Sequence, residues 1–200
     1  MTDPRPTPEA PDDDPYLWLE DVDGEPALAW VEAQNTATFA RFGGARFEAD
    51  RDMLAVIFDR PDNIPLIARR GPRVFNFWKD AAHPRGLWRV TTLDSYRSEQ
   101  PEWDILLDLD ALAIKESEDW TWSGATTIPG AHDRAIVKLS RRGADAVVLR
   151  EFDLASRDFV AGGFTLPEAK GGAAWLDRDQ LLLFSALGED MGEARAIRLD

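Results

Sequence analysis

Six short runs of aromatic and branched residues constrain the fold of this chain more than any other feature. Gly, Pro, Asp and Ser fill the gaps between the runs, which cover residues 74–80, 86–93, 103–110, 134–140, 145–154 and 180–187. This pattern is typical of β-strands separated by turns. Because no long helical pattern lies between the runs, we expect a mainly β, antiparallel architecture.

Two residue pairs recur at a constant interval within this region. The Asp-Leu pair at 108–109 returns at 153–154, and the apolar pair at 136–137 returns at 181–182, a step of 45 residues in both cases. A period of about 45 residues is typical of one four-stranded propeller blade. Residues 63–200 then hold about three antiparallel blades, whereas closed propellers have about four to eight. We therefore expect a partial β-propeller with open sheet edges, to be completed by polypeptide outside this sequence.

The first third of the chain has a different pattern, which predicts two helices. Apolar residues recur at steps of three and four over residues 25–42, with Pro26 in the first turn and Gly43-Gly44 after the end. A second helix is expected over residues 47–59, before Pro61. We divide the chain into a disordered, Pro- and Asp-rich tail (1–13), an N-terminal helical segment (14–62) and the partial β-propeller (63–200).

Charge and composition exclude several classes of function. The chain has 23 Lys and Arg against 37 Asp and Glu, a net charge of -14, so nucleic acid and anionic membrane surfaces are poor candidate partners. There is no cysteine, which excludes disulfides, thiolate metal sites and cysteine nucleophiles. No apolar run reaches the ~20 residues of a membrane span, and the N-terminus lacks a signal-peptide core. We expect a cytoplasmic protein.

Few residues are candidates for catalysis. No serine lies in the Gly-x-Ser-x-Gly pattern of an α/β-hydrolase, and Ser123, followed by Gly124, is the nearest approach. We interpret Ser123 as a residue of a blade turn. The two histidines, His83 and His132, lie in Gly- and Pro-flanked stretches where solvated turn residues are the ordinary case. Neither has metal-ligand spacing around it, so we expect no catalytic residue, no metal site and no cofactor.

The remaining candidate motifs also have structural interpretations. The glycine pairs 162–163 and 171–172 lack the strand–turn–helix context of a phosphate loop, and we interpret both as turns. We interpret the acidic run 12–14 as part of the tail, and the acid pairs 118–119 and 189–190 as surface features. Eight tryptophans suggest either sugar stacking or aromatic packing between blades, and we favour packing. Two of them, Trp122 and Trp175, precede the later strand groups.

Three separated blocks of sequence resemble the prolyl oligopeptidase family of serine peptidases. The first is DPYLWLEDVDGEPALAWVEAQN (14–35), with the family's Asp-Pro-Tyr start, its Trp-Leu-Glu turn and its Trp-Val-x-x-Gln-Asn helix end. The second is FNFWKDAAHPRGLWRVTTL (75–93), which is similar to the first propeller blade. The third, residues 143–183, resembles the following blades through REFDL, FTLPEAK and WLDRD. The likeness ends after Phe184, where the family's usual continuation is missing.

The resemblance implies a role in a larger peptidase. In that family a seven-bladed propeller limits entry to short peptides, and a C-terminal α/β-hydrolase domain supplies the catalytic serine, aspartate and histidine. The N-terminal helices pack on the hydrolase domain, which is the partner implied for the apolar segment 14–35. None of the family's catalytic positions matches this sequence, so the chain alone is expected to be inactive. Two alternatives remain open: a stand-alone β-rich protein-binding module without catalysis, and assembly with a hydrolase domain on a separate chain.

Overall fold

The computed structural model describes residues 14–21, 23–58, 60, 66–185 and 194–198. The chain divides into two units, Met1–Arg60 and Pro61–Asp200. The tail predicted over residues 1–13 and the acid pair at 189–190 lie outside the described residues. Of the acidic run 12–14, Asp14 alone is described.

The first unit is helical, as the sequence predicts. A short 3₁₀ turn (η1, Leu17–Glu20) precedes α1 (Glu25–Phe42) and α2 (Ala45–Phe58). Helix α1 has the predicted bounds, with Pro26 in its first turn, and it ends where the Gly43 N–H donates to the Phe39 carbonyl at 2.8 Å. A Cβ at Gly43 would lie 2.4 Å from that carbonyl oxygen, so this stop requires glycine. Helix α2 begins two residues earlier than predicted.

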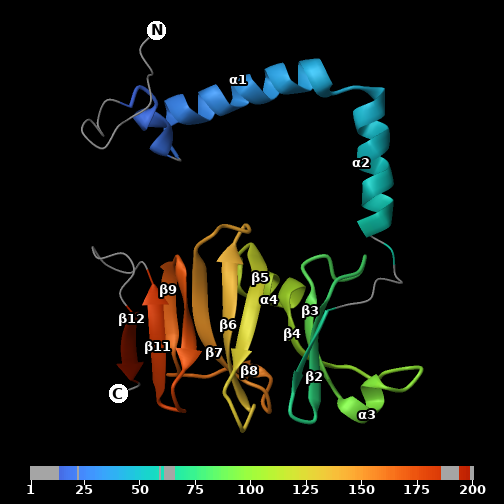
Figure 1. Cartoon of the computed structure of the whole chain (residues 1–200), viewed down its shortest axis with the longest axis vertical. Coiled ribbons are helices and arrows are strands. Elements are labelled where there is room, and N and C mark those ends of the chain that lie inside the picture. Colours follow the sequence, from blue (N-terminus) through green and yellow to red (C-terminus); the bar gives the residue numbers. More distant parts are fainter. Residues whose placement is uncertain (1–13, 22, 59, 61–65, 186–193, 199–200) are drawn as a thin grey trace. The chain divides into compact units, whose positions relative to one another are not determined.

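The second unit consists of three antiparallel sheets (Figure 1). The first sheet has the order β1 (Ile67–Arg70), β2 (Arg73–Trp78), β3 (Leu87–Thr92) and β4 (Asp104–Asp108). The helix α3 (Leu93–Tyr96) follows β3, and α4 (Leu109–Glu116) follows β4. Chain order and sheet order agree, which is the meander arrangement of a propeller blade.

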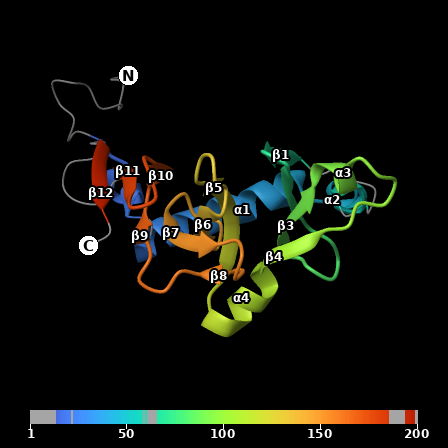
Figure 2. The same cartoon turned by 90° about the horizontal axis from the view of Figure 1, so that it is seen from below.

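The second and third sheets continue this pattern. The second contains β5 (Trp120–Thr127), β6 (Arg134–Arg141) and β7 (Val147–Asp153), and β7 also pairs with β8 (Asp158–Phe159) and β9 (Thr165–Ala169). The third has the order β10 (Gly171–Trp175), β11 (Gln180–Ser185) and β12 (Ala194–Arg198). Figure 2 shows β1 and β5 on one side of their sheets and β4 and β8 on the opposite side. The predicted partial propeller of about three blades is confirmed.

Aromatic side chains hold neighbouring sheets together. Phe77 of the first sheet stacks on Trp122 of the second, with ring centroids 5.0 Å apart, and Trp88 meets Phe152 edge-to-face at 5.5 Å. Trp88 and Phe152 belong to one buried cluster with the fully buried Val137 and Leu139, and Phe77 and Trp122 are partly buried and pack against it. A second cluster joins the second and third sheets, where the Trp175 indole N–H donates to the Thr126 carbonyl at 2.8 Å. Packing between blades therefore explains Trp88, Trp122 and Trp175, as predicted.

Several local predictions are wrong. The run 103–110 does not stay extended to its end, because the Asp108 carboxylate accepts a hydrogen bond from Ala111 N and starts α4, which buries Leu109 and Leu112. The pair Gly171-Gly172 is not a turn but the start of β10, paired with Phe184 and Ser185. The pair Gly162-Gly163 does lie in a turn.

The 45-residue step is only partly structural. Residues 136–137 lie in β6 and residues 181–182 in β11, each the second strand of its sheet in chain order. The other pair is not equivalent, because Asp108 ends the fourth strand of its sheet and Asp153 ends the third. One of the two matches is therefore a true repeat position, and the other is a coincidence of dipeptides.

Candidate functional site

The serine and the two histidines lie in different parts of the sheet unit. Ser123 lies within β5, at a bulge between Trp122 and Gly124, so its prediction as a turn residue is wrong. His83 lies in the β2–β3 loop and His132 in the β5–β6 loop, as expected for loop histidines. Among the described residues, His83 is hydrogen-bonded to Asp80 and His132 to Thr127, and no hydrogen bond joins Ser123 to either histidine.

The nearest arrangement to a catalytic dyad organises a loop instead. The Asp80 carboxylate lies 2.9 Å from His83 Nδ1, and it accepts hydrogen bonds from the Trp78 indole N–H at 2.9 Å and from the backbone N–H of Ala82 and His83. The Trp78 hydrogen bond is the largest cause that lowers the pKa of Asp80 from 3.8 to about 2, and His83 contributes while desolvation opposes it. All these bonds fix the start of the β2–β3 loop.

This origin of the low pKa gives a first prediction. Trp78→Phe keeps an aromatic ring but removes the indole donor, so we expect the pKa of Asp80 to rise from about 2 toward its ordinary value of 3.8. The midpoint can be followed by carboxyl ¹³C NMR. Because the folded-state pKa is lowered, the associated stability is present above the unfolded pKa and is lost as the pH falls toward 2. Trp103→Phe is the matched control. If Asp80 had the same titration midpoint in both variants, the Trp78 hydrogen bond would not be the cause of its low pKa.

Ion pairs tie the first sheet to the second at the end where α4 lies. Arg85 in the β2–β3 loop pairs with Asp119 and donates to the Trp120 carbonyl, while its backbone N–H binds the Asp110 carboxylate. Glu116 of α4 accepts from Arg150 of β7 at 2.8 Å and from the Trp120 indole. The acid pair Glu118-Asp119 is partly exposed, as predicted. Glu118 forms an ion pair with Arg141, and Asp119 forms the one with Arg85.

One face of the first sheet carries an arginine held between two tryptophans. The Arg89 guanidinium lies 4.7 Å from the Trp78 ring centroid and 5.0 Å from that of Trp103. Its Nε donates to Asn76 Oδ1 at 3.2 Å, and Asn76 Nδ2 is buried without a hydrogen-bond partner among the described residues. Asn76 and Arg89 alternate with Phe75, Phe77 and Trp88, which pack toward the second sheet, so this is the opposite face.

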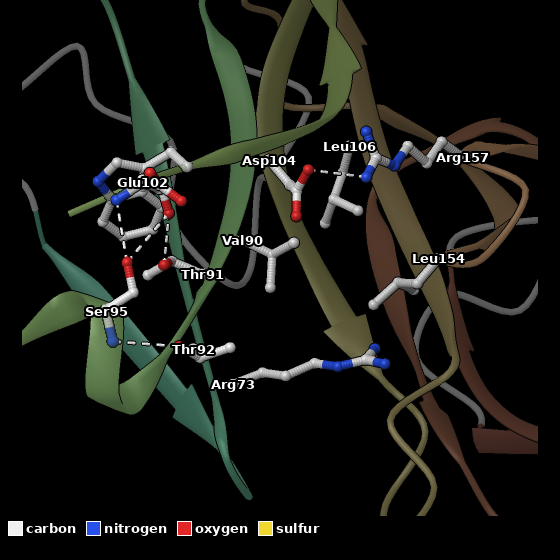
Figure 3. A pocket seen from close by; sticks show the side chains of 11 residues that line it. Arg73, Val90, Thr91, Thr92, Ser95, Glu102, Asp104, Leu106, Leu154 and Arg157 are labelled. Carbon is white, nitrogen blue, oxygen red and sulfur yellow. Dashed lines mark hydrogen bonds and ion pairs between the residues drawn. The ribbon is translucent and has the colours of Figure 1, made fainter.

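A cavity of about 560 Å³ lies between the first and second sheets, at the end where β2 begins and β7 ends. Its apolar lining is Val90, Leu106 and Leu154 (Figure 3). Arg73 extends along one edge, and an ion pair between Arg157 and Asp104, 2.9 Å long, closes the other. Thr91, Thr92, Ser95, Glu102 and Trp103 complete the lining on the side of α3. The volume lies within the range of small-molecule sites.

The described residues contain neither a metal site nor a membrane span. No group of three or more His, Asp or Glu side chains there is arranged to hold a metal ion. No helix in the described ranges is both long enough and apolar enough to cross a membrane. The sequence interpretation missed the cavity and its arginine, although the segment RRGPR (69–73) stands out as basic in an acidic chain.

Comparison with known proteins identifies the family. The model of the prolyl oligopeptidase N-terminal beta-propeller domain matches residues 6–197. An uncharacterized peptidase, y4nA, of Sinorhizobium fredii is 39% identical over 172 residues, which is 84% of this chain and 23% of the relative. An uncharacterized peptidase of Rickettsia prowazekii, RP174, is 27% identical over 183 residues, 86% of this chain and 25% of the relative. The chain thus spans about a quarter of the length of these curated relatives.

Solved structures agree with this result. The structure of a post-proline cleaving enzyme from Rickettsia typhi superposes with a TM-score of 0.74 and 28% identity, covering 86% of this chain and 26% of that protein. The structure of oligopeptidase B from Leishmania major, 15% identical with a TM-score of 0.56, covers 84% of this chain and 24% of that protein and supports the fold alone. With the match over residues 6–197, these similarities show that the chain belongs to the N-terminal β-propeller domain of the prolyl oligopeptidase family.

Proposed function

We propose that this chain is the propeller portion of a prolyl oligopeptidase-like serine peptidase and restricts access of short peptides to a catalytic α/β-hydrolase domain. The observation that carries the proposal is the match to the family's propeller model over residues 6–197. The relatives that it matches over about a quarter of their length are named peptidases. Because one structural relative is a post-proline cleaving enzyme, proline-containing peptides are the substrate class to test. A cytoplasmic location remains part of this proposal.

The described side chains support a role in access rather than catalysis. Ser123 has no histidine partner, and the Asp80–His83 pair is committed to its own loop. Acyl transfer by a serine peptidase requires a serine activated by histidine, an aspartate that orients the histidine, and an oxyanion hole. In this proposal the hydrolase domain supplies all of these groups, and the present chain hydrolyses no peptide by itself.

The helical unit supports docking on a further domain. Large apolar side chains of α1 are substantially exposed, including Leu28, Trp30, Val31, Phe39 and Phe42. Soluble proteins seldom leave such a series uncovered unless it is an interaction surface. The face of the first sheet that carries Arg89 also leaves Ile67 and Ile105 more than 40% exposed, where a further blade would bury them. We assign the helical face to the hydrolase domain and the sheet face to another part of the propeller.

The experiment is a chimera with the Rickettsia typhi enzyme. Residues 14–185 of this chain replace the matched segment of that enzyme, and hydrolysis of a short proline-containing peptide is measured. We expect the chimera to hydrolyse the peptide and the isolated chain to show no activity above buffer. Hydrolysis by the isolated chain, abolished by Ser123→Ala, would overturn the proposal. So would a folded chimera without activity, because the two parts would then not belong together.

A further inference from the structure

The hairpin formed by β1 and β2 is a basic site in an acidic protein. It carries Arg69, Arg70 and Arg73, although the chain as a whole has a net charge of -14. None of the three forms an ion pair with a described residue. Their side chains donate hydrogen bonds to backbone carbonyls: Arg69 to Gly71 at 3.1 Å, Arg70 to Arg69 at 2.9 Å and Arg73 to His132 at 3.3 Å. With so many carboxylates available, three unpaired guanidinium groups in one turn require an explanation.

The strand register places two of these charges side by side. Arg70 is directly opposite Arg73 in the antiparallel pair, so both side chains leave the same face of the hairpin. Like charges directly opposite each other in a sheet are destabilising. This face also carries Phe75, which packs toward the second sheet, whereas Arg69 is opposite Val74 on the other face. A bound anion beside Arg73 would relieve the repulsion.

The cavity lies beside this face, and two of its charged side chains, Arg73 and Glu102, have no ion-pair partner among the described residues. Four charged residues line it: Arg73, Arg157, Glu102 and Asp104. Arg157 is paired with Asp104, and Glu102 lies beside Ser95, whose Oγ accepts a hydrogen bond from the Glu102 backbone N–H (Figure 3). The Arg73 side chain extends away from Glu102 toward the second sheet, with Val90 and Leu154 above it and Leu106 farther away, beside the Asp104–Arg157 pair. The cavity therefore combines an apolar floor with a guanidinium that has no carboxylate partner among the described residues and whose Nη1 donates to the His132 carbonyl.

We propose that this cavity binds the C-terminal residue of a peptide, with its carboxylate on Arg73 and an apolar side chain on Val90, Leu106 and Leu154. A guanidinium matches a carboxylate through two parallel hydrogen bonds, and the apolar floor selects an organic carboxylate over inorganic phosphate. The inference rests on the proposed function only for the idea that peptides reach this surface. In that setting the cavity is an anchoring site for the C-terminal end of a peptide.

The test is an NMR titration of the ¹⁵N-labelled chain at constant ionic strength. The probes are N-acetyl-leucine, N-acetyl-leucinamide, which lacks the carboxylate, and inorganic phosphate. We expect N-acetyl-leucine to give saturable shifts at the amides of Thr92, Leu106 and Leu154. A charge-assisted hydrogen bond contributes about 1.5–3 kcal/mol, so the amide analogue should bind at least about tenfold more weakly. Phosphate should compete only weakly.

Variants of the hairpin separate the cavity from general charge attraction. Arg73→Gln should weaken N-acetyl-leucine binding about tenfold. Arg73→Lys keeps the positive charge but lacks the paired N–H donors of guanidinium, so its affinity should lie between those of the parent chain and Arg73→Gln. Arg69→Gln is the matched control, since it removes the same charge from the other face, and should change the affinity less than about twofold. Equal losses in the Arg69 and Arg73 variants, equal binding of the amide, or no saturable shift would each overturn the proposal. None of these results depends on peptidase activity, so the proposed function is tested separately.

Discussion

Replacing Phe152 with Ala should lower the free energy of unfolding of the sheet unit by about 3–5 kcal/mol, the usual loss for a buried Phe. Phe152 is fully buried in β7 and lies between Trp88 of the first sheet and Phe159 of its own sheet, both in edge-to-face geometry. Truncation opens a cavity where two blades meet, and removes two aromatic contacts as well as buried area. Urea unfolding followed by circular dichroism measures the loss.

The control for Phe152 is an apolar residue of the same unit that buries little surface. Ile114 of α4 is 82% exposed, so Ile114→Ala should change the unfolding free energy by less than about 0.5 kcal/mol. A loss below about 1 kcal/mol for Phe152→Ala would mean that the sheets do not pack through this ring.

Replacing Glu151 with Ala is the second large effect, and we expect a loss of about 2–3 kcal/mol. Glu151 is a buried charge in β7, only 5% exposed. Its Oε2 accepts the backbone N–H of Phe164 at 3.0 Å, and its Oε1 lies 3.6 Å from Arg134 Nη1. The Glu151 backbone N–H also donates to the Phe164 carbonyl, and the Glu151 carbonyl accepts from the Val160 N–H. The variant keeps these backbone bonds but leaves the buried Phe164 N–H without its carboxylate acceptor, which loosens the segment that leads to β9.

Hydrogen exchange distinguishes this mechanism from a general loss of stability. The Phe164 amide should exchange faster in Glu151→Ala relative to amides of β6, whereas Glu151→Gln, which keeps an acceptor oxygen, should protect it largely as in the parent chain. Glu168→Ala is the matched control on β9, because its bond to Arg141 is partly exposed and Arg141 retains Glu118. Equal exchange at Phe164 in the Ala and Gln variants would contradict the role of the carboxylate.

The sequence predicts best those strands that carry their own apolar run. The apolar runs 134–140 and 145–154 predict strands, and β6 and β7 lie at Arg134–Arg141 and Val147–Asp153, where their branched residues are buried. By contrast β5 contains Ser123-Gly124, and β10 begins with Gly171-Gly172, so neither has an apolar run. These segments become strands by pairing with β6 and β11, an interaction between neighbours that local composition does not encode.

The functional surface was less predictable than the fold. The basic segment 69–73 is visible in the sequence, but the register that places Arg70 opposite Arg73 depends on the β1–β2 pairing. The cavity needs Leu154 and Arg157 beside Val90 and Leu106, residues of two different sheets. The histidines were correctly assigned to loops because Gly and Pro flank them, which is local information.

Substrate length in the chimera tests the central claim most directly. The measurement is the ratio of kcat/KM for a short proline-containing peptide to that for an unfolded proline-containing protein. It is made for the chimera and for the same enzyme lacking residues 66–185 of this chain. A propeller that restricts access predicts a high ratio for the chimera and a much lower ratio for the shortened enzyme, through faster cleavage of the protein. The same ratio in both enzymes would contradict the claim that this chain selects substrates by size.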